Sequence, residues 1–209
     1  ASFNYAKLNY ELSNPYEDAI KALKKFLDEY PNSVNKKDAN RYLANLYITT
    51  KDYDNALISI SEAGLNTPEM KEAFQKVSYF RGVEYFNALK TDKAISLFTQ
   101  SLQYPVTATY VALANYWKGE SYFKKKEYDK ALESYANFQS TPGSSKLSEY
   151  SLSQYNKGYC YFMKEDYASA ATSFRLFYDD GSKNSRLKDD ASLRLGDSYF
   201  MMSKYASAI

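Results

Sequence analysis

The chain has 209 residues, of which 27 are basic and 25 acidic, so its formal net charge is only +2. Binding to nucleic acid depends on concentrated positive charge. A chain with nearly equal numbers of basic and acidic residues does not supply it. The sequence contains no histidine and a single cysteine. These counts exclude Ser–His and Cys–His nucleophilic pairs, an internal disulfide and any metal site built from histidine or clustered cysteine.

Apolar residues recur in steps of three and four along almost the whole chain, which indicates amphipathic helices, and no β-type alternation persists. No apolar run approaches the roughly 20 residues that a membrane-spanning helix needs. Turn-forming residues divide the chain into pairs of helices, predicted over residues 2–12 and 16–29, 37–49 and 53–63, 69–88 and 91–103, 107–124 and 128–139, 147–163 and 167–178, and then a last first helix over 186–201 with the opening residues of its partner.

An alanine recurs every 37 to 39 residues, and a tyrosine precedes each of these alanines by nine residues. The alanines are Ala19, Ala56, Ala94, Ala131, Ala170 and Ala208, and the tyrosines are Tyr10, Tyr47, Tyr85, Tyr122, Tyr161 and Tyr199. Self-similarity with such a period predicts a solenoid, in which each unit buries its apolar face only against its neighbours.

In four units the tyrosine belongs to the pattern Gly-x-x-Tyr-Phe, which begins at Gly82, Gly119, Gly158 and Gly196. A glycine inside a helix costs about 1 kcal/mol relative to alanine. Its retention in four units predicts that a bulkier side chain would clash with a neighbouring helix at each position.

This pattern resembles the tetratricopeptide repeat family, as the fourth unit illustrates with Gly119, Tyr122, Ala131 and Tyr135. The resemblance implies an all-α fold, a right-handed α-solenoid superhelix of antiparallel helix pairs with about five and a half repeats. The whole chain, 1–209, is then one solenoid body, with repeats over residues 1–35, 36–66, 67–106, 107–145, 146–184 and a shortened 185–209.

The period is longer than the family's usual length of about 34 residues. The segments 26–33 and 174–181 are similar to the lengthened repeats of bacterial envelope assembly factors, the TolA-binding and outer-membrane-assembly lipoprotein classes. That resemblance implies a periplasmic or cell-envelope location. Because the sequence starts inside a predicted helix and stops one residue after the sixth alanine, we also expect it to belong to a longer chain.

Stacked helix pairs form a concave groove lined by the first helices, and solenoids hold extended partners there. The groove positions vary from unit to unit, which is where partner specificity could be encoded, although drift on a solvated face explains the same variation. The candidate residues that bind a partner are Arg41, Asn45, Tyr79, Val83, Tyr116, Trp117, Glu120, Tyr155, Tyr159 and Asp197.

Other chemistry has little support in the sequence. Cys160 lies between two aromatic residues, where we expect a small packed thiol, and Ser121 with Lys124 matches a nucleophile–lysine spacing without its companion motifs. The acidic turn 179–182 does not continue into a calcium-binding loop. We predict no enzymatic activity, no catalytic residue, no metal site and no cofactor.

Three hypotheses for function remain. The first is a scaffold that binds a protein or peptide segment in the groove through aromatic burial. The second is a glycan- or peptidoglycan-binding module, since aromatic faces also stack on sugars. The third is single-stranded RNA binding, which the balanced charge disfavours. Family members that clamp a C-terminal carboxylate use cations where this chain has Leu113 and Trp117, so we do not expect that mode.

The last predicted helix has only the start of a partner, so we expect its apolar stripe of Leu195, Tyr199 and Met202 to be partly exposed. Exposed apolar patches of this kind favour self-association.

Overall fold

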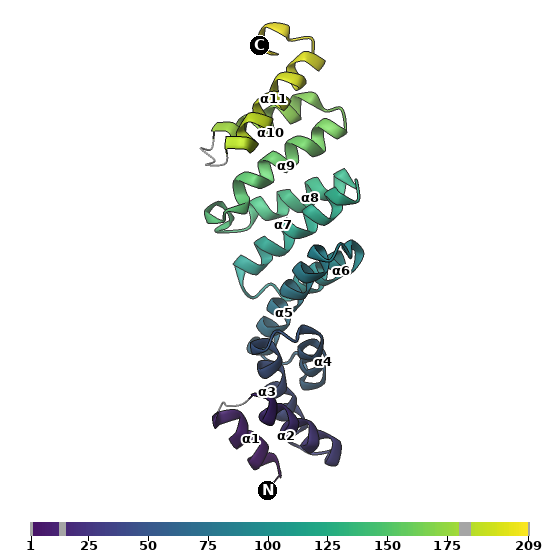
Figure 1. Ribbon diagram of the computed structural model, residues 1–209, viewed down its shortest axis with the longest axis vertical. Coiled ribbons are helices and arrows are strands. Elements are labelled where there is room, and N and C mark those ends of the chain that lie inside the picture. The colour runs from purple at the N-terminus through teal and green to yellow at the C-terminus, as the bar shows by residue number, and fades with distance from the viewer. Residues whose placement is uncertain (1, 13–15, 180–184, 209) are drawn as a thin grey trace.

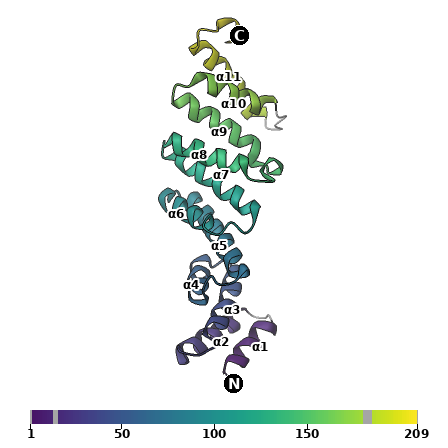
Figure 2. The ribbon, with the colours of Figure 1, turned by 180° about the vertical axis from the view of Figure 1, so that it is seen from behind.

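The computed structural model describes residues 2–12, 16–179 and 185–208. Within these ranges the regular structure consists of twelve α-helices and one short 3-10 turn, arranged as antiparallel pairs that follow one another along a single long axis (Figure 1). The two chain termini lie at opposite ends of this elongated body, as the view from behind also shows (Figure 2).

The helices alternate between two structural roles. The first helices of the pairs are α1 (Ser2–Leu12), α3 (Lys36–Thr49), α5 (Pro68–Asn87), α7 (Ala108–Lys124), α9 (Glu149–Met163) and α11 (Ser185–Met201). The second helices are α2 (Tyr16–Glu29), α4 (Tyr53–Ala63), α6 (Thr91–Ser101), α8 (Tyr128–Ser140), α10 (Tyr167–Asp179) and α12 (Tyr205–Ala208). Each predicted helix is therefore present, with ends that agree to within about two residues.

The first helices form the inner side of the curve. Besides the contacts within pairs, α1 approaches α3, α5 approaches α7, and α7 approaches α9, while successive second helices make no comparable contact among the described residues. The first helices therefore crowd together on the inside and the second helices spread apart on the outside. We call these two sides the inner and outer faces.

The same turn joins the two helices of each pair from α3 to α12. Its central residue has a positive φ although it is not glycine, at Lys51, Leu89, Lys126, Glu165 and Ser203. The next residue donates its backbone N–H to the carbonyl of the repeated tyrosine, as from Lys90 to Tyr85 at 2.8 Å. This hydrogen bond is the signature of a Schellman helix end, so one turn geometry recurs through the array.

The repeated glycines let the second helix of a pair pack closely against the first. A Cβ built on Gly82 would lie 2.7 Å from the ring of Phe98, and Gly119 and Gly158 stand in the same relation to Tyr135 and Phe174. The clash predicted from the sequence is confirmed in these three units, and its cause is an aromatic ring from the partner helix.

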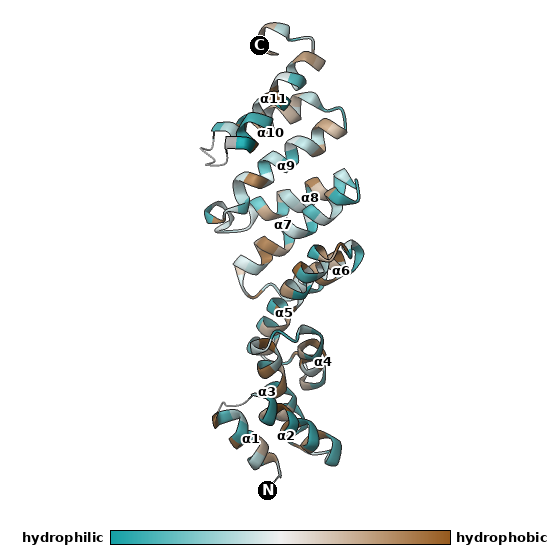
Figure 3. Cartoon of the chain, viewed as in Figure 1, coloured by the Kyte–Doolittle hydropathy of each residue, from teal (hydrophilic) through white to brown (hydrophobic). Residues whose placement is uncertain are grey.

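Buried apolar residues form four successive clusters instead of one central core, as expected for a body in which each unit meets only its neighbours. Apolar and polar residues alternate along the helices throughout the array (Figure 3). Trp117 packs against two of the clusters and so connects consecutive units.

The start of α9 differs from the prediction. A 3-10 turn at Ser144–Lys146 follows Gly143, whose φ is 85°, and α9 begins at Glu149. Ser144 is buried and donates its hydroxyl to the carbonyl of Gln139 at 3.1 Å, which holds this connection against the end of α8.

At the far end of the chain, Leu195, Tyr199 and Met202 are each partly exposed, although α10 packs on one side of α11 and the short helix α12 follows it. The segment 180–184 between α10 and α11, which includes most of the acidic turn considered above, lies outside the described residues.

Candidate functional site

The inner face is the candidate binding site, and the structure divides its predicted residues into buried and accessible groups. Tyr79 and Tyr116 are only 8% and 5% exposed. Burial raises the pKa of Tyr79 to about 12, which keeps its hydroxyl protonated at physiological pH. These two tyrosines are packing residues with little surface left for a partner.

Trp117, on α7, offers a more accessible ring. It is half-buried, with its centroid 5.0 Å from that of Phe86 and 5.4 Å from that of Tyr116, both in edge-on geometry. Its indole Nε1 is buried, beside the hydroxyl of Tyr79.

Glu120 forms a polar contact between the fourth and fifth units. Its Oε1 accepts a hydrogen bond from the hydroxyl of Tyr135 at 2.5 Å and a second from the side-chain amide of Asn156, on α9. Burial raises the pKa of the Glu120 carboxyl, and the two hydrogen bonds only partly oppose this effect. Glu120, one of the candidate partner-binding residues, thus joins neighbouring first helices.

Tyr155 and Tyr159 perform a similar task between α9 and α11. Both hydroxyls donate to Oδ2 of Asp190, from Tyr155 at 2.7 Å. Partial burial alone would raise the pKa of Asp190, but the hydrogen bonds from Tyr159 and Tyr155 hold it below its usual value. Both rings are half-buried, so each keeps some surface on the inner face while its hydroxyl is engaged.

The remaining candidates lie toward the two ends of the groove. Asp197 accepts a hydrogen bond from Arg194 Nη1 at 2.7 Å. Asn45 is exposed and donates to the hydroxyl of Tyr10 at 3.3 Å, and Arg41 is exposed and paired with Asp38 on its own helix. Val83 is half-buried against the core of the third unit.

Sequence reasoning missed three residues of this face, namely Asn156, Asp190 and Arg194. They lie two or six residues before the glycine of their own unit, which is one helical step beyond the positions that we considered. Extending the same spacing toward the start of each first helix would have found them.

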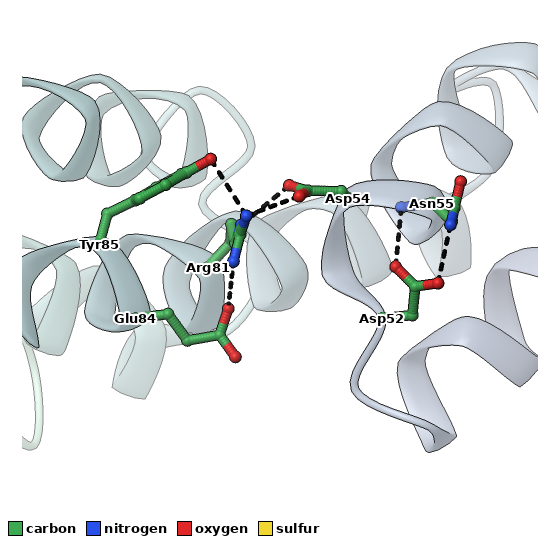
Figure 4. A network of polar contacts seen from close by, with 6 residues as sticks. All are labelled: Asp52, Asp54, Asn55, Arg81, Glu84 and Tyr85. Atoms are coloured by element: carbon green, nitrogen blue, oxygen red, sulfur yellow. Dashed lines mark hydrogen bonds and ion pairs between the residues drawn. The ribbon is translucent and has the colours of Figure 1, made fainter. Parts of the chain in front are cut away.

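A second polar network joins the second helix α4 to the next first helix, α5 (Figure 4). Arg81 binds both carboxylate oxygens of Asp54, with Nε–Oδ1 at 2.8 Å and Nη2–Oδ2 at 2.6 Å. The same guanidinium donates to Glu84 at 2.7 Å and to the hydroxyl of Tyr85 at 3.1 Å. Such planar two-point pairing fixes the geometry between units more strictly than a single ion pair.

The single cysteine is held as an unreactive, buried thiol. Cys160 is fully buried, and burial, followed by the nearby Glu120, raises the pKa of its thiol to about 12, so little reactive thiolate forms near neutral pH. Within the described part of the chain, no cluster of acidic or cysteine side chains could hold a metal ion, and no helix is both long and apolar enough to cross a membrane.

Comparisons with known proteins agree with this architecture. Two family profiles, each described as a tetratricopeptide repeat, match residues 1–33 and 81–145. A comparison with curated protein sequences gives no match.

Several solved structures share the fold at low sequence identity. The structure of MamA protein is 17% identical, with a TM-score of 0.53 over 84% of this chain and 87% of its own. BtubC from P. vanneervenii is 14% identical, with a TM-score of 0.58 over 94% and 87%. A tetratricopeptide repeat protein from Parabacteroides merdae is 18% identical, with a TM-score of 0.51 over 99% of this chain and 74% of its own.

The stacked antiparallel pairs, the separate core clusters and the shared turn define an α-solenoid. The two profile matches show that the chain contains tetratricopeptide repeats, and the structural neighbours share its fold. Proteins of this fold generally mediate protein–protein interaction.

Proposed function

We propose that the chain is a non-enzymatic scaffold that holds an extended segment of another protein along its inner face. The supporting observation is the set of half-buried rings on neighbouring first helices, Trp117 on α7 and Tyr155 and Tyr159 on α9. Large aromatic side chains that are already held in place offer contact area at a low entropic cost.

The charges on this face fit a partner of mixed polarity. Asp190, Arg194 and Asp197 lie together on α11, while Arg41 and Asn45 lie on α3 at the other end. These groups would set the direction and register of the bound segment, and aromatic burial would supply most of the affinity.

Site-specific photocrosslinking tests which face binds. A photoreactive phenylalanine derivative placed at exposed Asn45 or Lys124 samples the inner side, and the same group at Ile58, which is 60% exposed on α4, is the matched outer control. We expect adducts with partner protein from positions 45 and 124 and few from position 58. Equal crosslinking from both sides, or crosslinking only from position 58, would contradict the proposal.

A glycan or peptidoglycan partner is the second candidate, because the same rings could stack on sugars. Trp117 is the only tryptophan, so its fluorescence reports directly on this part of the inner face. A saturable change in emission on addition of soluble peptidoglycan fragments would favour the glycan. An unchanged emission, together with peptide-dependent changes, would favour the protein segment.

The cellular location is a further proposal. The lengthened repeats are the feature that favours a bacterial envelope, and fractionation of the source cells with an antibody against this chain tests it. Recovery in the cytosolic fraction alone would contradict an envelope location.

A further inference from the structure

The residue directly before the repeated glycine is a cation in three consecutive units. These residues are Arg81, Lys118 and Lys157, on α5, α7 and α9. The shared register places each of them on the edge of its helix that faces the preceding second helix.

At the first of these positions, the positive charge of Arg81 is paired with carboxylates. It pairs with Asp54 on the preceding second helix and with Glu84 on its own helix (Figure 4). Its charge is therefore neutralised within the chain.

Lys157 has no such partner. Its Nζ donates to the amide oxygen of Gln139 on α8 at 2.9 Å, and Gln139 in turn donates to Ser153 at 2.7 Å. Among the described residues, no carboxylate lies within ion-pair distance of this ammonium group. A half-buried cation that meets only a neutral amide has lost water without gaining a counter-charge, which is unfavourable.

The direction of the pKa shift differs between Lys157 and the lysines that have a carboxylate partner. Burial lowers the pKa of Lys157, with no acidic group acting against it. The opposite holds for Lys125, Lys130 and Lys164, whose pKa values are raised by hydrogen bonds to aspartate or glutamate. Lys157 would therefore gain from an anionic partner that the other three already possess.

A groove lies beside Lys157 on the outer side of α9, where α10 forms its other wall. Lys157, Gln154 and Tyr161 supply an ammonium, an amide and a phenol group from α9, and Ser169 adds a hydroxyl from α10. The hydroxyl of Thr172, also on α10, already donates to the carbonyl of Ala168 at 3.0 Å. No aspartate or glutamate is among the described residues that line it. The groove thus offers several donors around one uncompensated cation.

We propose that this outer groove between α9 and α10 is a second binding site, which accepts a carboxylate side chain, from Asp or Glu, of a protein partner. The carboxylate pairs with Lys157 as Asp54 pairs with Arg81, and Gln154 and Tyr161 are placed to donate further hydrogen bonds. The site is on the outer side of the array, so it does not depend on what the inner face binds.

Lysine side-chain NMR on the whole chain, labelled with ¹³C at lysine Cε, tests the assignment. The probes are the capped peptides Ac-Ala-Glu-Ala-NH₂ and Ac-Ala-Gln-Ala-NH₂, titrated at constant ionic strength. We expect a saturable shift of the Lys157 resonance and a rise in its pKa with the glutamyl peptide alone. Lys118, at the same position one unit earlier and beside the Tyr122 ring, serves as the internal control and should not respond.

Each of the following results would overturn the proposal. They are the absence of a saturable Lys157 response, an equal response to the glutaminyl peptide, and tighter binding of inorganic phosphate than of the glutamyl peptide. The last result would indicate a phosphate site instead. A capped peptide whose only carboxylate is its C-terminus distinguishes the two carboxylate sources, and its tighter binding would overturn the assignment to a side chain.

Variants separate the charge from the fold. With the methyl group of Thr172 as reporter, Lys157→Met should weaken binding of the glutamyl peptide about tenfold or more, since hydrogen bonds to charged groups are the strong ones. Lys157→Arg should restore binding, and Lys118→Met should leave it unchanged. Because Lys157→Met removes a half-buried charge, its thermal unfolding midpoint should not fall. Binding that survives Lys157→Met, or an equal loss in Lys118→Met, would contradict the site.

Discussion

At Gly119 the ring of Tyr135 leaves no room for a methyl group, since a Cβ there would lie 2.7 Å from the ring. Gly119→Ala should therefore lower the free energy of unfolding by about 1–3 kcal/mol, because overpacking outweighs the higher helix propensity of alanine. Gly196→Ala is the matched control, because its Cβ would approach only the carbonyl of Ala208, at 3.1 Å. Urea denaturation measures both, and an equal effect would show that the ring contact is unimportant.

Glu120 should make stability depend on pH in a direction opposite to that of most acidic residues. Burial raises its pKa in the folded chain, so folding favours the protonated form and stability falls as pH rises from the unfolded value through the folded one. Glu120→Gln keeps an oxygen that can accept from Tyr135 and Asn156 and removes the charge. We expect the variant to be more stable than the parent at pH 7, with the difference shrinking below about pH 4.3.

Thermal unfolding of both proteins from pH 4 to pH 8 measures this difference. A constant difference across that range would mean that Glu120 does not titrate differently on folding. A variant that is less stable at pH 7 would mean that the hydrogen bonds require the charged carboxylate.

At the scale of the elements, the inter-helix turn stores strain in a residue that is not glycine. Leu89 has a φ of 58° and is 74% exposed, so its side chain contributes little packing while its backbone is in the left-handed region. Leu89→Gly should stabilise the chain by about 1 kcal/mol. Ala88→Gly is the control, because φ at Ala88 is −80° and glycine there only adds flexibility. Equal changes in urea denaturation for both variants would contradict the strain.

Helix positions could be predicted from the sequence because their signals are local. Apolar spacing and turn residues located every helix, and the glycine pattern indicated close packing before the ring partners were known. The 3-10 turn at Ser144–Lys146 was missed, since it depends on the buried hydroxyl of Ser144 reaching the end of α8, a contact outside the segment itself.

The inner face was harder to predict, because spacing identifies the side of a helix but not how deep a residue lies between neighbouring units. Tyr116 and Tyr155 hold the same position in consecutive first helices, yet Tyr116 is buried and Tyr155 is half-buried with its hydroxyl on Asp190. That hydrogen bond joins residues 35 apart in sequence, and no single-repeat pattern contains it.

For the whole molecule, the apolar surface of α11 predicts weak self-association. Leu193 and Phe200, both on α11, are 58% and 61% exposed. We expect sedimentation velocity to show concentration-dependent association that the double change Leu193→Lys and Phe200→Ser abolishes. Ile58→Ser, at a similarly exposed apolar residue on α4, should leave it unchanged. A single species at all concentrations would exclude association through this surface.

Stability should also vary along the array, because each helix pair is held only by its neighbours and the outermost pairs have one neighbour instead of two. Hydrogen exchange should therefore be slowest in α5 to α9 and fastest in α1 and α11. Gly119→Ala, in the middle, should accelerate exchange in α7 and α8 and then in the units that they contact, whereas Gly196→Ala should act on α11 alone. The cross-unit contacts Arg81–Asp54 and Glu120–Asn156 would carry the central effect outward. If every helix exchanged at one common rate in the parent and in both variants, the chain would unfold as a single cooperative block, and the nearest-neighbour description of its stability would be wrong.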